Sequence, residues 1–138
     1  MEPQGSEIPR AGFVLKGIIL LKSNFERANV FPVDKEIQNE FRINNEYSIQ
    51  EDKTFHVILT CNLHAIIKET QQAIMSAEIV MAGWFDTVGE TSLPIEEFAT
   101  KNAVAIIFPF VREHISSLTL KSGIAHVLLP SLNFQDTK

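Results

Sequence analysis

Cysteine is nearly absent from this sequence, and its scarcity excludes several kinds of site. Cys61 is the single cysteine among 138 residues. One thiol cannot form a disulfide within a chain, and it cannot build a zinc site that needs several cysteines. A protein without a disulfide framework is typical of a reducing compartment. We therefore expect a cytoplasmic protein that is stabilised by packing rather than by cross-links.

A secretory leader and long apolar runs are also missing. The chain opens with MEPQGSEIPRAG, which has no apolar region of the kind found in signal peptides. Its uninterrupted apolar runs are far shorter than the ~20 residues needed to cross a bilayer. The sequence therefore predicts a soluble protein without membrane insertion.

Positive charge is in short supply. The 12 lysines and arginines are outnumbered by 17 acidic residues, which gives a formal net charge of -5. Nucleic-acid binding needs clustered lysine and arginine to neutralise phosphates, and the sequence has no such cluster. The turn from Gly89 to Ser92 also lacks the lysine and the spacing of a phosphate-binding loop. We expect no nucleic-acid partner and no cofactor.

What the sequence does contain is enough apolar material for one globular domain. Hydrophobic residues make up 45% and charged residues 21% of the chain, which is ordinary for a folded protein. With 138 residues there is no room for a second domain. The prolines and glycines of residues 1–12 predict a flexible N-terminal arm. Residues 13–134 are predicted to form the single domain, and residues 135–138 a short tail.

Alternation of apolar and polar residues predicts four strands ahead of any helix. They span residues 13–27, 37–49, 55–67 and 73–85. The third alternates most clearly, whereas the fourth is apolar on both faces, which predicts cover on both. Asn44 and Asn45 interrupt the second strand and predict a bulge or a tight bend there. One face of the first strand is predicted to collect Phe13, Leu15, Ile19, Leu21 and Phe25.

A helical pattern follows the strands. Pro94 suits the start of a short first helix, and Gly123 predicts the end of a long second one, because glycine accepts a left-handed backbone. Pro109 is unusual inside that helix, since it removes one backbone donor. Steps of three and four residues make an apolar stripe from Val104, Ile107, Val111, Ile115 and Leu118. The rest of that surface is predicted to carry Arg112, Glu113, Ser116, Thr119 and Lys121.

Strands first and helices second predict an α+β fold, with a four-stranded antiparallel sheet followed by a short and a long helix packed on one face. The segment Ala103–Phe110 is apolar nearly all round, which predicts cover on more than one side. A second copy of the chain is the simplest cover, so we expect an oligomer. Arg112 and Glu113 are expected to anchor the helix to a neighbouring segment by ion pairing.

Cys61 and His64 look most like a catalytic pair, but their spacing separates them. Three residues along a strand place two side chains on opposite faces, so we interpret Cys61 as a buried structural cysteine. His56 and His64 share a face but lie roughly 26 Å apart, too far to hold one metal ion. His114 and His126 have no ligand cluster around them in the sequence. We therefore predict no catalytic residue, no metal site and no enzyme activity.

One combination of motifs resembles a known family. The run FPFVREHISSLTLKSG and the later LLPSLNF are similar to the C-terminal core of the SecB family of protein-export chaperones. That core has an aromatic-Pro-aromatic segment, Arg-Glu, a helix, Gly and a closing Leu-Pro-x-x-Asn-Phe. Weaker resemblance through AEIVMAGWF and SNFERANVF extends it to most of residues 13–134. The matching positions are Phe108, Pro109, Phe110, Arg112, Glu113, Gly123, Leu129, Pro130, Asn133 and Phe134.

The resemblance implies an ATP-independent holdase that keeps non-native preproteins unfolded for export and delivers them to the SecA motor. It also implies long apolar grooves between sheet and helix layers, and a homotetramer built as a dimer of dimers. The positions that match the family's subunit interface are Ala77, Glu78, Ile79 and Met81. We predict the client-binding groove near the second strand and the closing segment, at Phe31, Ile37, Phe41, Ile43, Phe85, Leu129, Leu132 and Phe134.

Several alternatives stay open. Only QDTK follows LNF, without the further helix and acidic tail through which family members engage SecA. This favours, as one alternative, a SecB-like chaperone dedicated to a single client, such as the antitoxin of a toxin-antitoxin-chaperone system. Another is a small α+β enzyme that uses His64 or His126 as a base in a closed pocket. The last is a structural subunit that oligomerises without binding clients.

Overall fold

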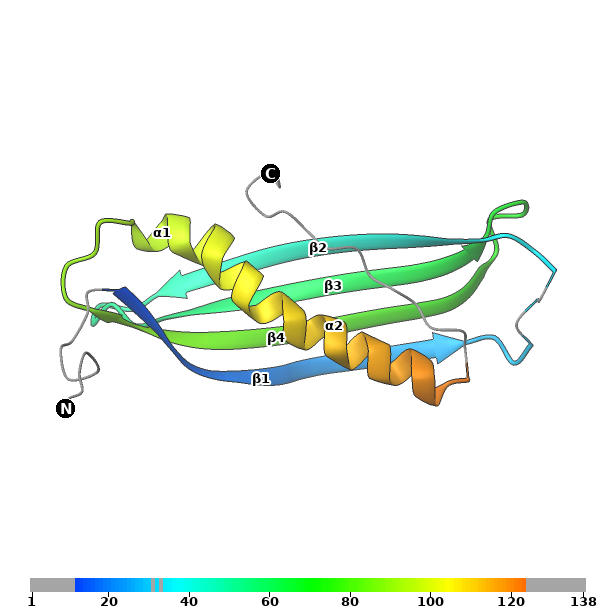
Figure 1. The fold of residues 1–138 in the computed structure, drawn as a ribbon, viewed down its shortest axis with the longest axis horizontal. Coiled ribbons are helices and arrows are strands. Elements are labelled where there is room, and N and C mark those ends of the chain that lie inside the picture. Colours follow the sequence, from blue (N-terminus) through cyan, green and yellow to red (C-terminus); the bar gives the residue numbers. More distant parts are fainter. Residues whose placement is uncertain (1–11, 31, 33, 124–138) are drawn as a thin grey trace, which may run out of the picture.

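Four strands precede the helices, as the sequence predicts. The computed structural model describes residues 12–30, 32 and 34–123. The strands are β1 (Gly12–Arg27), β2 (Ile37–Ile49), β3 (Phe55–Ile67) and β4 (Ala73–Val88). All pairings are antiparallel, and the strand order is β1-β4-β3-β2. Figure 1 shows one curved sheet with the helices on one face, so the predicted fold class is confirmed.

The helical part has three segments. It begins with α1 (Ile95–Glu97), passes through one π-helical turn, η2 (Phe98–Asn102), and continues as α2 (Ala103–Lys121). Figure 1 shows α2 crossing the sheet diagonally, from the β2 side at its start to the β1 side at its end. Arg27 of β1 fixes that end, because its Nη1 donates to the carbonyl oxygen of Ser122 over 2.7 Å. Gly123 has a φ of 76°, which confirms the predicted left-handed stop.

The strands present two different faces. On the helix-side face, Leu59 of β3 and Ile79 of β4 are fully buried beneath α2. On the opposite face, which we call the open face, Thr60 and Val80 are half-buried. Thr60 pairs directly with Val80, and directly paired residues point to the same side of a sheet. No described helix lies over the open face (Figure 1), so within the described chain β4 is covered on one face and not on both.

β1 is less regular than its neighbours. Its pairing with β4 leaves Lys16 and Leu21 as extra residues, one at each of two irregularities in the register. An extra residue in a strand reverses the alternation that follows it. The predicted single face of this strand is therefore wrong in the middle. Ile18, rather than Ile19, packs against the core there, and Ile19 is 45% exposed.

β2 shows the opposite departure from the sequence prediction. It pairs with β3 without interruption from Ile37 to Ile49, so the bulge predicted at Asn44 and Asn45 is wrong. β2 is an edge strand, and both asparagines are exposed. An exposed edge tolerates amide side chains on either face, and such residues need no bulge to reach water.

The stripe predicted for α2 is confirmed. Four of its five side chains are buried, and Leu118 is half-buried. Thr119, predicted on the exposed surface, is instead fully buried, and its hydroxyl donates to the carbonyl oxygen of Ser116 over 3.0 Å. Pro109 lies inside α2 on the exposed side, as does Ala105. Pro109 has no N–H to donate to the carbonyl oxygen of Ala105. This oxygen lies on the exposed side of the helix, where water can donate to it instead.

Helix and sheet meet closely at Gly83 of β4. A Cβ atom built on Gly83 would lie 3.0 Å from Cδ1 of Ile107, so the Ile107 side chain would have to shift to admit even an alanine. Four phenylalanines close the neighbouring end of the core. The Phe55 and Phe85 rings stack at 5.1 Å, and Phe13 lies 4.3 Å from Phe98 between ring centroids.

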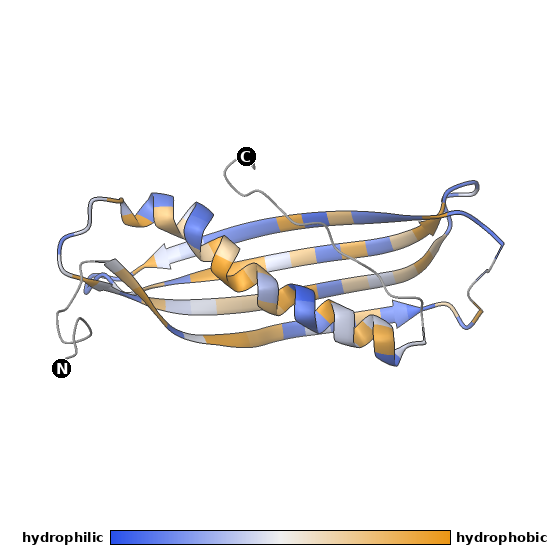
Figure 2. Ribbon diagram, viewed as in Figure 1, coloured by the Kyte–Doolittle hydropathy of each residue, from blue (hydrophilic) through white to orange (hydrophobic). Residues whose placement is uncertain are grey.

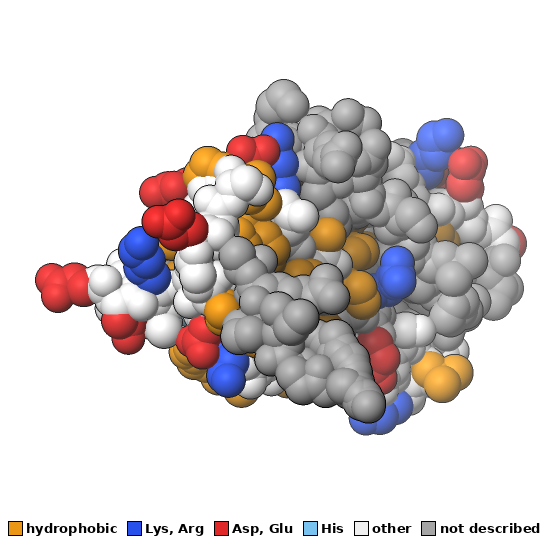
Figure 3. All heavy atoms as spheres, turned by 60° about the vertical axis from the view of Figure 1, so that its left-hand side comes forward, with side chains coloured by type: hydrophobic (Ala, Val, Ile, Leu, Met, Phe, Trp, Pro, Cys, Tyr) orange, Lys and Arg blue, Asp and Glu red, His pale blue; other side chains and the backbone are white. Residues whose placement is uncertain are grey.

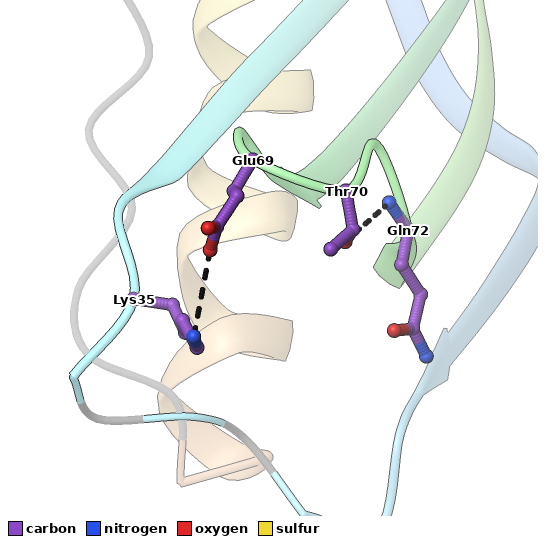
Figure 4. A network of polar contacts seen from close by, with 4 residues as sticks. All are labelled: Lys35, Glu69, Thr70 and Gln72. Carbon is purple, nitrogen blue, oxygen red and sulfur yellow. Dashed lines mark hydrogen bonds and ion pairs between the residues drawn. The ribbon is translucent and has the colours of Figure 1, made fainter.

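Polar contacts shape the turn between β3 and β4 (Figure 4). Lys35 Nζ, in the segment before β2, lies 3.4 Å from Glu69 Oε1 in this turn. The backbone N–H of Gln72 donates to the Thr70 hydroxyl over 3.3 Å. Exposed ion pairs contribute only ~0–1 kcal/mol each. These contacts therefore fix the turn geometry, whereas the core supplies most of the stability.

The helical run Ile95–Lys121 has 27 residues and is long and apolar enough to cross a membrane by length and composition alone. The sequence expectation considered uninterrupted apolar runs and missed it. In the structure, Val104, Ile107 and Val111 of this run are buried against the sheet. The core helix of a globular domain passes the same test, so the run is weak evidence for a membrane span.

The predicted domain boundaries lie mostly outside the described residues. β1 begins at Gly12, a residue assigned to the N-terminal arm. The remainder of that arm, the stretch from 124 to 134 and the tail at 135–138 are not described. The boundaries therefore stay predictions.

Candidate functional site

One apolar surface lies along the side of α2 that faces β2, and we call it the β2 flank. Its strand residues are Ile37, Phe41 and Ile43, all half-buried and packed against the core cluster. Its helix residues are Phe108 and Arg112, one turn apart on the same side of α2. The Phe41 and Phe108 rings meet edge to face, 5.8 Å between centroids. The predicted groove residues at positions 37, 41 and 43 therefore share one flank of the helix.

The other predicted groove residues do not join them in the described chain. Phe85 is 1% exposed and stacks on Phe55, so it is a core residue and we leave it out of the proposed groove. Phe31, Leu129, Leu132 and Phe134 lie outside the described residues. Phe108 is 3% exposed, so it too is a core residue, and it supports Phe41 from beneath. Arg112, one turn along α2, is exposed and was missed as a neighbour of the groove.

A second apolar surface lies on the other side of α2, and we call it the β1 flank. Leu15 and Leu20 of β1 are 37% and 44% exposed, and Ile106 and Phe110 of α2 are 36% and 48% exposed. Ile106 and Phe110 continue at a spacing of four to His114, whose Nε2 lies 2.8 Å from the Ser23 hydroxyl oxygen in β1. The apolar half of α2 is thus covered on one side only by the described chain.

Hydrophobic and charged side chains are distributed unevenly over the surface. Figure 2 shows hydrophobic and hydrophilic residues interleaved along the strands and along α2. Figure 3 brings one end of the molecule forward and shows charged side chains at its tip, with hydrophobic side chains gathered behind them. Exposed apolar surface with a polar border is typical of a site for polypeptide partners.

The residues predicted at the subunit interface do not form one exposed surface. Ala77, Ile79 and Met81 are at most 7% exposed, and all three belong to the helix-side core. Glu78 faces the open side, where its Oε1 lies 2.9 Å from Lys22 Nζ. Within the described chain, three of the four positions support α2 from below.

The open face carries a polar hollow of about 480 Å3. Its polar lining comes from three adjacent strands and consists of Asn24, Glu26, Asn62, His64, Ser76 and Glu78. Two of these side chains are carboxylates, and one of them is already paired with lysine. The hollow lies on an uncovered sheet face, unlike the closed pocket that the enzyme alternative predicts.

Cys61 lies on the helix-side face and is completely buried. Burial raises the pKa of its thiol from the ordinary 9.0 to about 12, because a thiolate would lose its hydration there. His64, three residues along β3, is exposed on the open face, so the predicted separation of the two side chains is confirmed. A thiol of this kind is a poor nucleophile.

Histidines and acidic residues do not gather into a metal site in the described part of the chain, where no group of three or more His, Cys, Asp or Glu side chains could hold an ion. His56 is half-buried on β3. His114 bonds to Ser23, and His126 lies outside the described residues.

A two-layer α+β domain whose helix has exposed apolar side chains along one flank and half-buried ones along the other is suited to polypeptide contacts. The sequence profile described as "Preprotein translocase subunit SecB" matches residues 21–137 of this chain. The chain belongs to the SecB family. The resemblance noted in the sequence is therefore confirmed.

Individual relatives support this assignment. The protein-export protein SecB of Saccharophagus degradans is 29% identical over 127 residues, covering 90% of this chain and 75% of that protein. The protein-export protein SecB of Methylococcus capsulatus is 26% identical over 129 residues, covering 91% and 82%. An uncharacterized protein of Methanocaldococcus jannaschii is 27% identical over 127 residues, covering 91% and 81%.

Among solved structures, the Mycobacterium tuberculosis SecB-like chaperone Rv1957 superposes with a TM-score of 0.78 at 17% identity. The match covers 88% of this chain and 91% of that one. That chaperone was solved in complex with a ChAD peptide from the Rv1956 HigA1 antitoxin. At this level of identity the likeness shows a shared fold.

Proposed function

We propose that this protein is an ATP-independent holdase, a chaperone that binds non-native polypeptides and prevents their folding or aggregation. The observation that carries the proposal is the β2 flank of a SecB-family chain, where Phe41 and Ile43 stay half-buried and Phe41 meets the Phe108 ring. Burying such a surface against a client contributes about 25 cal/mol per Å2 of apolar area. No nucleotide or covalent step is needed, so we propose neither a cofactor nor enzyme activity.

The proposed clients are non-native preproteins on their way to export. The relatives named protein-export protein SecB favour this role. Delivery to SecA in the cytoplasm would complete it, and binding of SecA is a separate measurement from client holding.

A dedicated client is the second candidate. The Rv1957 structure, solved with an antitoxin peptide, supports it because the folds agree over most of both chains. The two roles differ in how many different clients the chaperone binds. An export chaperone holds many unrelated unfolded chains with similar affinity, whereas a dedicated one prefers a single antitoxin segment by orders of magnitude.

We also propose a homotetramer, arranged as a dimer of dimers. The β1 flank supports it, because four large apolar side chains remain about 36–48% exposed there, and contact with a second copy would cover them. In this proposal Ala77, Ile79 and Met81 act by holding α2 in place rather than by touching the partner. Glu78 stays a predicted interface residue on the open face.

Phe110→Asp tests the assembly. We expect light scattering at micromolar concentration to show a tetramer for the unaltered protein and a smaller species for the variant, because the new carboxylate would be desolvated in the interface. Glu113→Asp, on the exposed surface of the same helix, is the matched control and should stay tetrameric. A monomeric unaltered protein would refute the assembly.

Phe41→Asp tests the holdase activity. The unaltered protein should suppress aggregation of a slowly folding client at stoichiometric concentration without ATP. The variant should lose most of this suppression, because it puts a charge on the β2 flank. Asn44→Asp places the same charge on the open face of the same strand, and this variant should still suppress aggregation. Circular dichroism must show that both variants are folded. Equal suppression by the two variants would mean that clients bind to another surface.

A further inference from the structure

The C-terminal end of α2 is anchored through Arg27 of β1. The ion pairing predicted for Arg112 and Glu113 is not found, because no ion pair among residues 12–30, 32 and 34–123 includes either of them. Nη1 of Arg27 instead donates to the carbonyl oxygen of Ser122 over 2.7 Å. Ser122 is the residue that ends α2. The last carbonyl groups of a helix have no partner within it, and the helix dipole favours a positive charge there.

The same guanidinium also holds the start of the connection between β1 and β2. Its Nε donates to the carbonyl oxygen of Ala28 over 2.7 Å, and its Nη2 to that of Asn29 over 3.4 Å. The backbone N–H of Ala28 donates to the carbonyl oxygen of Ile74 in β4 over 2.9 Å. Figure 1 shows this connection leaving β1 beside the end of α2. One half-buried arginine therefore joins two segments that are far apart in the sequence.

Val30 directly follows the anchored residues. It is 79% exposed, more than any other large hydrophobic side chain in the described ranges. The other end of the connection is fixed to the turn between β3 and β4, where the Lys68 N–H donates to the Glu36 carbonyl oxygen over 2.9 Å. The next residue, Ile37, begins the β2 flank. Seven residues span at most about 25 Å, so one extended polypeptide of about eight residues can contact Val30 and the β2 flank together.

We infer that Arg27 is a positioning residue for client binding, which presents Val30 as an apolar contact for client segments that extend beyond the β2 flank. The inference rests on the proposed holdase function. The occupant is an extended apolar stretch of a non-native polypeptide, because the connection leads directly into the surface proposed to hold such chains. Without the guanidinium, the start of the connection loses its link to α2. Client binding would then have to order this segment, which lowers the affinity.

A double-mutant cycle tests whether Arg27 acts through Val30. Dissociation constants are measured by anisotropy for a fluorescent, unstructured peptide that is rich in leucine and phenylalanine and long enough to span both surfaces. Val30→Ser and Arg27→Gln should each weaken binding about threefold to tenfold. The double variant should bind about as tightly as Arg27→Gln alone, whereas independent effects would multiply. Arg42→Gln removes an exposed arginine from the open face of β2 and should leave binding unchanged.

A second comparison separates positioning from a loss of stability. Arg27→Lys keeps a positive charge at the end of α2 but lacks the planar fork that reaches two segments. It should therefore retain most of the thermal stability and recover only part of the affinity. Cys61→Ala removes packing from the core and should bind the peptide normally despite its lower stability. Light scattering should show the same assembly for every variant.

Four results would overturn the inference and leave the holdase function standing. They are unchanged binding by Arg27→Gln, losses that multiply in the double variant, an affinity that follows thermal stability across the Arg27 and Cys61 variants, and a smaller assembly for Arg27→Gln. A different result refutes the holdase function and this inference with it: the unaltered protein neither binds the peptide nor suppresses aggregation of a client.

Discussion

The two faces of the sheet are built from the same four strands but differ in burial and in charge. Leu59 and Ile79 face α2 and are 0% exposed, whereas their neighbours Thr60 and Val80 face the open side and stay half-buried. All strand carboxylates among the described residues fall on the open face. The comparison shows that alternation decides two things at once: which side chains build the core, and where negative charge is allowed.

The largest expected effect comes from a charge on the helix-side face. Ile79→Asp buries a carboxylate in the core and should destabilise the fold by more than about 4 kcal/mol. Val80 is the next residue and faces the open side, so Val80→Asp should lower the free energy of unfolding much less. Thermal unfolding followed by circular dichroism measures both. A folded Ile79→Asp monomer would instead support the prediction that this residue lies at the subunit interface.

A methyl group at a glycine gives a smaller contrast. Gly83→Ala places a Cβ 3.0 Å from Ile107 Cδ1 and 3.3 Å from Phe85 Cε1. The crowding should cost about 1–3 kcal/mol. Gly17 lies on the open face, and a Cβ built on it would have no neighbouring atom within 4 Å. Gly17→Ala should therefore leave the free energy of unfolding unchanged or raise it slightly. Equal losses in chemical denaturation would mean that the open face is covered as well.

The smallest effect is expected at Cys61. Cys61→Ala should cost about 1 kcal/mol through lost packing and leave client holding unchanged. Asn62→Ala, on the open face, serves as the control. Loss of client holding in folded Cys61→Ala would overturn the interpretation of this thiol as structural.

The same thiol also makes a prediction about pH. In the folded protein its pKa is raised from 9.0 to about 12, so above pH 9 the unfolded chain releases a proton that the folded chain keeps. Stability should therefore fall as pH rises through this range, with the contribution of Cys61 fully present only below pH 9. Cys61→Ala should remove this part of the alkaline loss. Alkylation at pH 8 should proceed at the rate of unfolding in the unaltered protein.

Most of the fold could be predicted from the sequence, because its strong signals are local. The alternation in β3 and the stripe from Val104 to Leu118 each depend on one element, and both are confirmed. The register of β1 could not be predicted, since a bulge depends on the partner strand. Thr119 was misplaced for a different reason: its hydroxyl donates to a carbonyl oxygen of its own helix, which lets a polar residue be buried.

The candidate site was harder to predict than the fold. Phe41 and Ile43 were chosen because they lie on the second strand, and the structure packs both against the core, with Phe41 in contact with Phe108 of α2. Phe85 shows the limit of that reasoning, because an aromatic residue near a loop can still point into the core. Arg112 could have been found from its spacing of four to Phe108.

The irregular pairing of β1 has a consequence for how the gene can change in length. Loss of one codon inside a strand ordinarily inverts every side chain beyond it. Lys16 and Leu21 are not paired with any residue of β4 in the strand register, so deletion of either would turn its bulge into a regular ladder and leave the remaining pairs in phase. Ile79 has partners on both sides, and deletion there has no such relief. The edge strand can therefore shorten by single residues during evolution, whereas the central strand cannot.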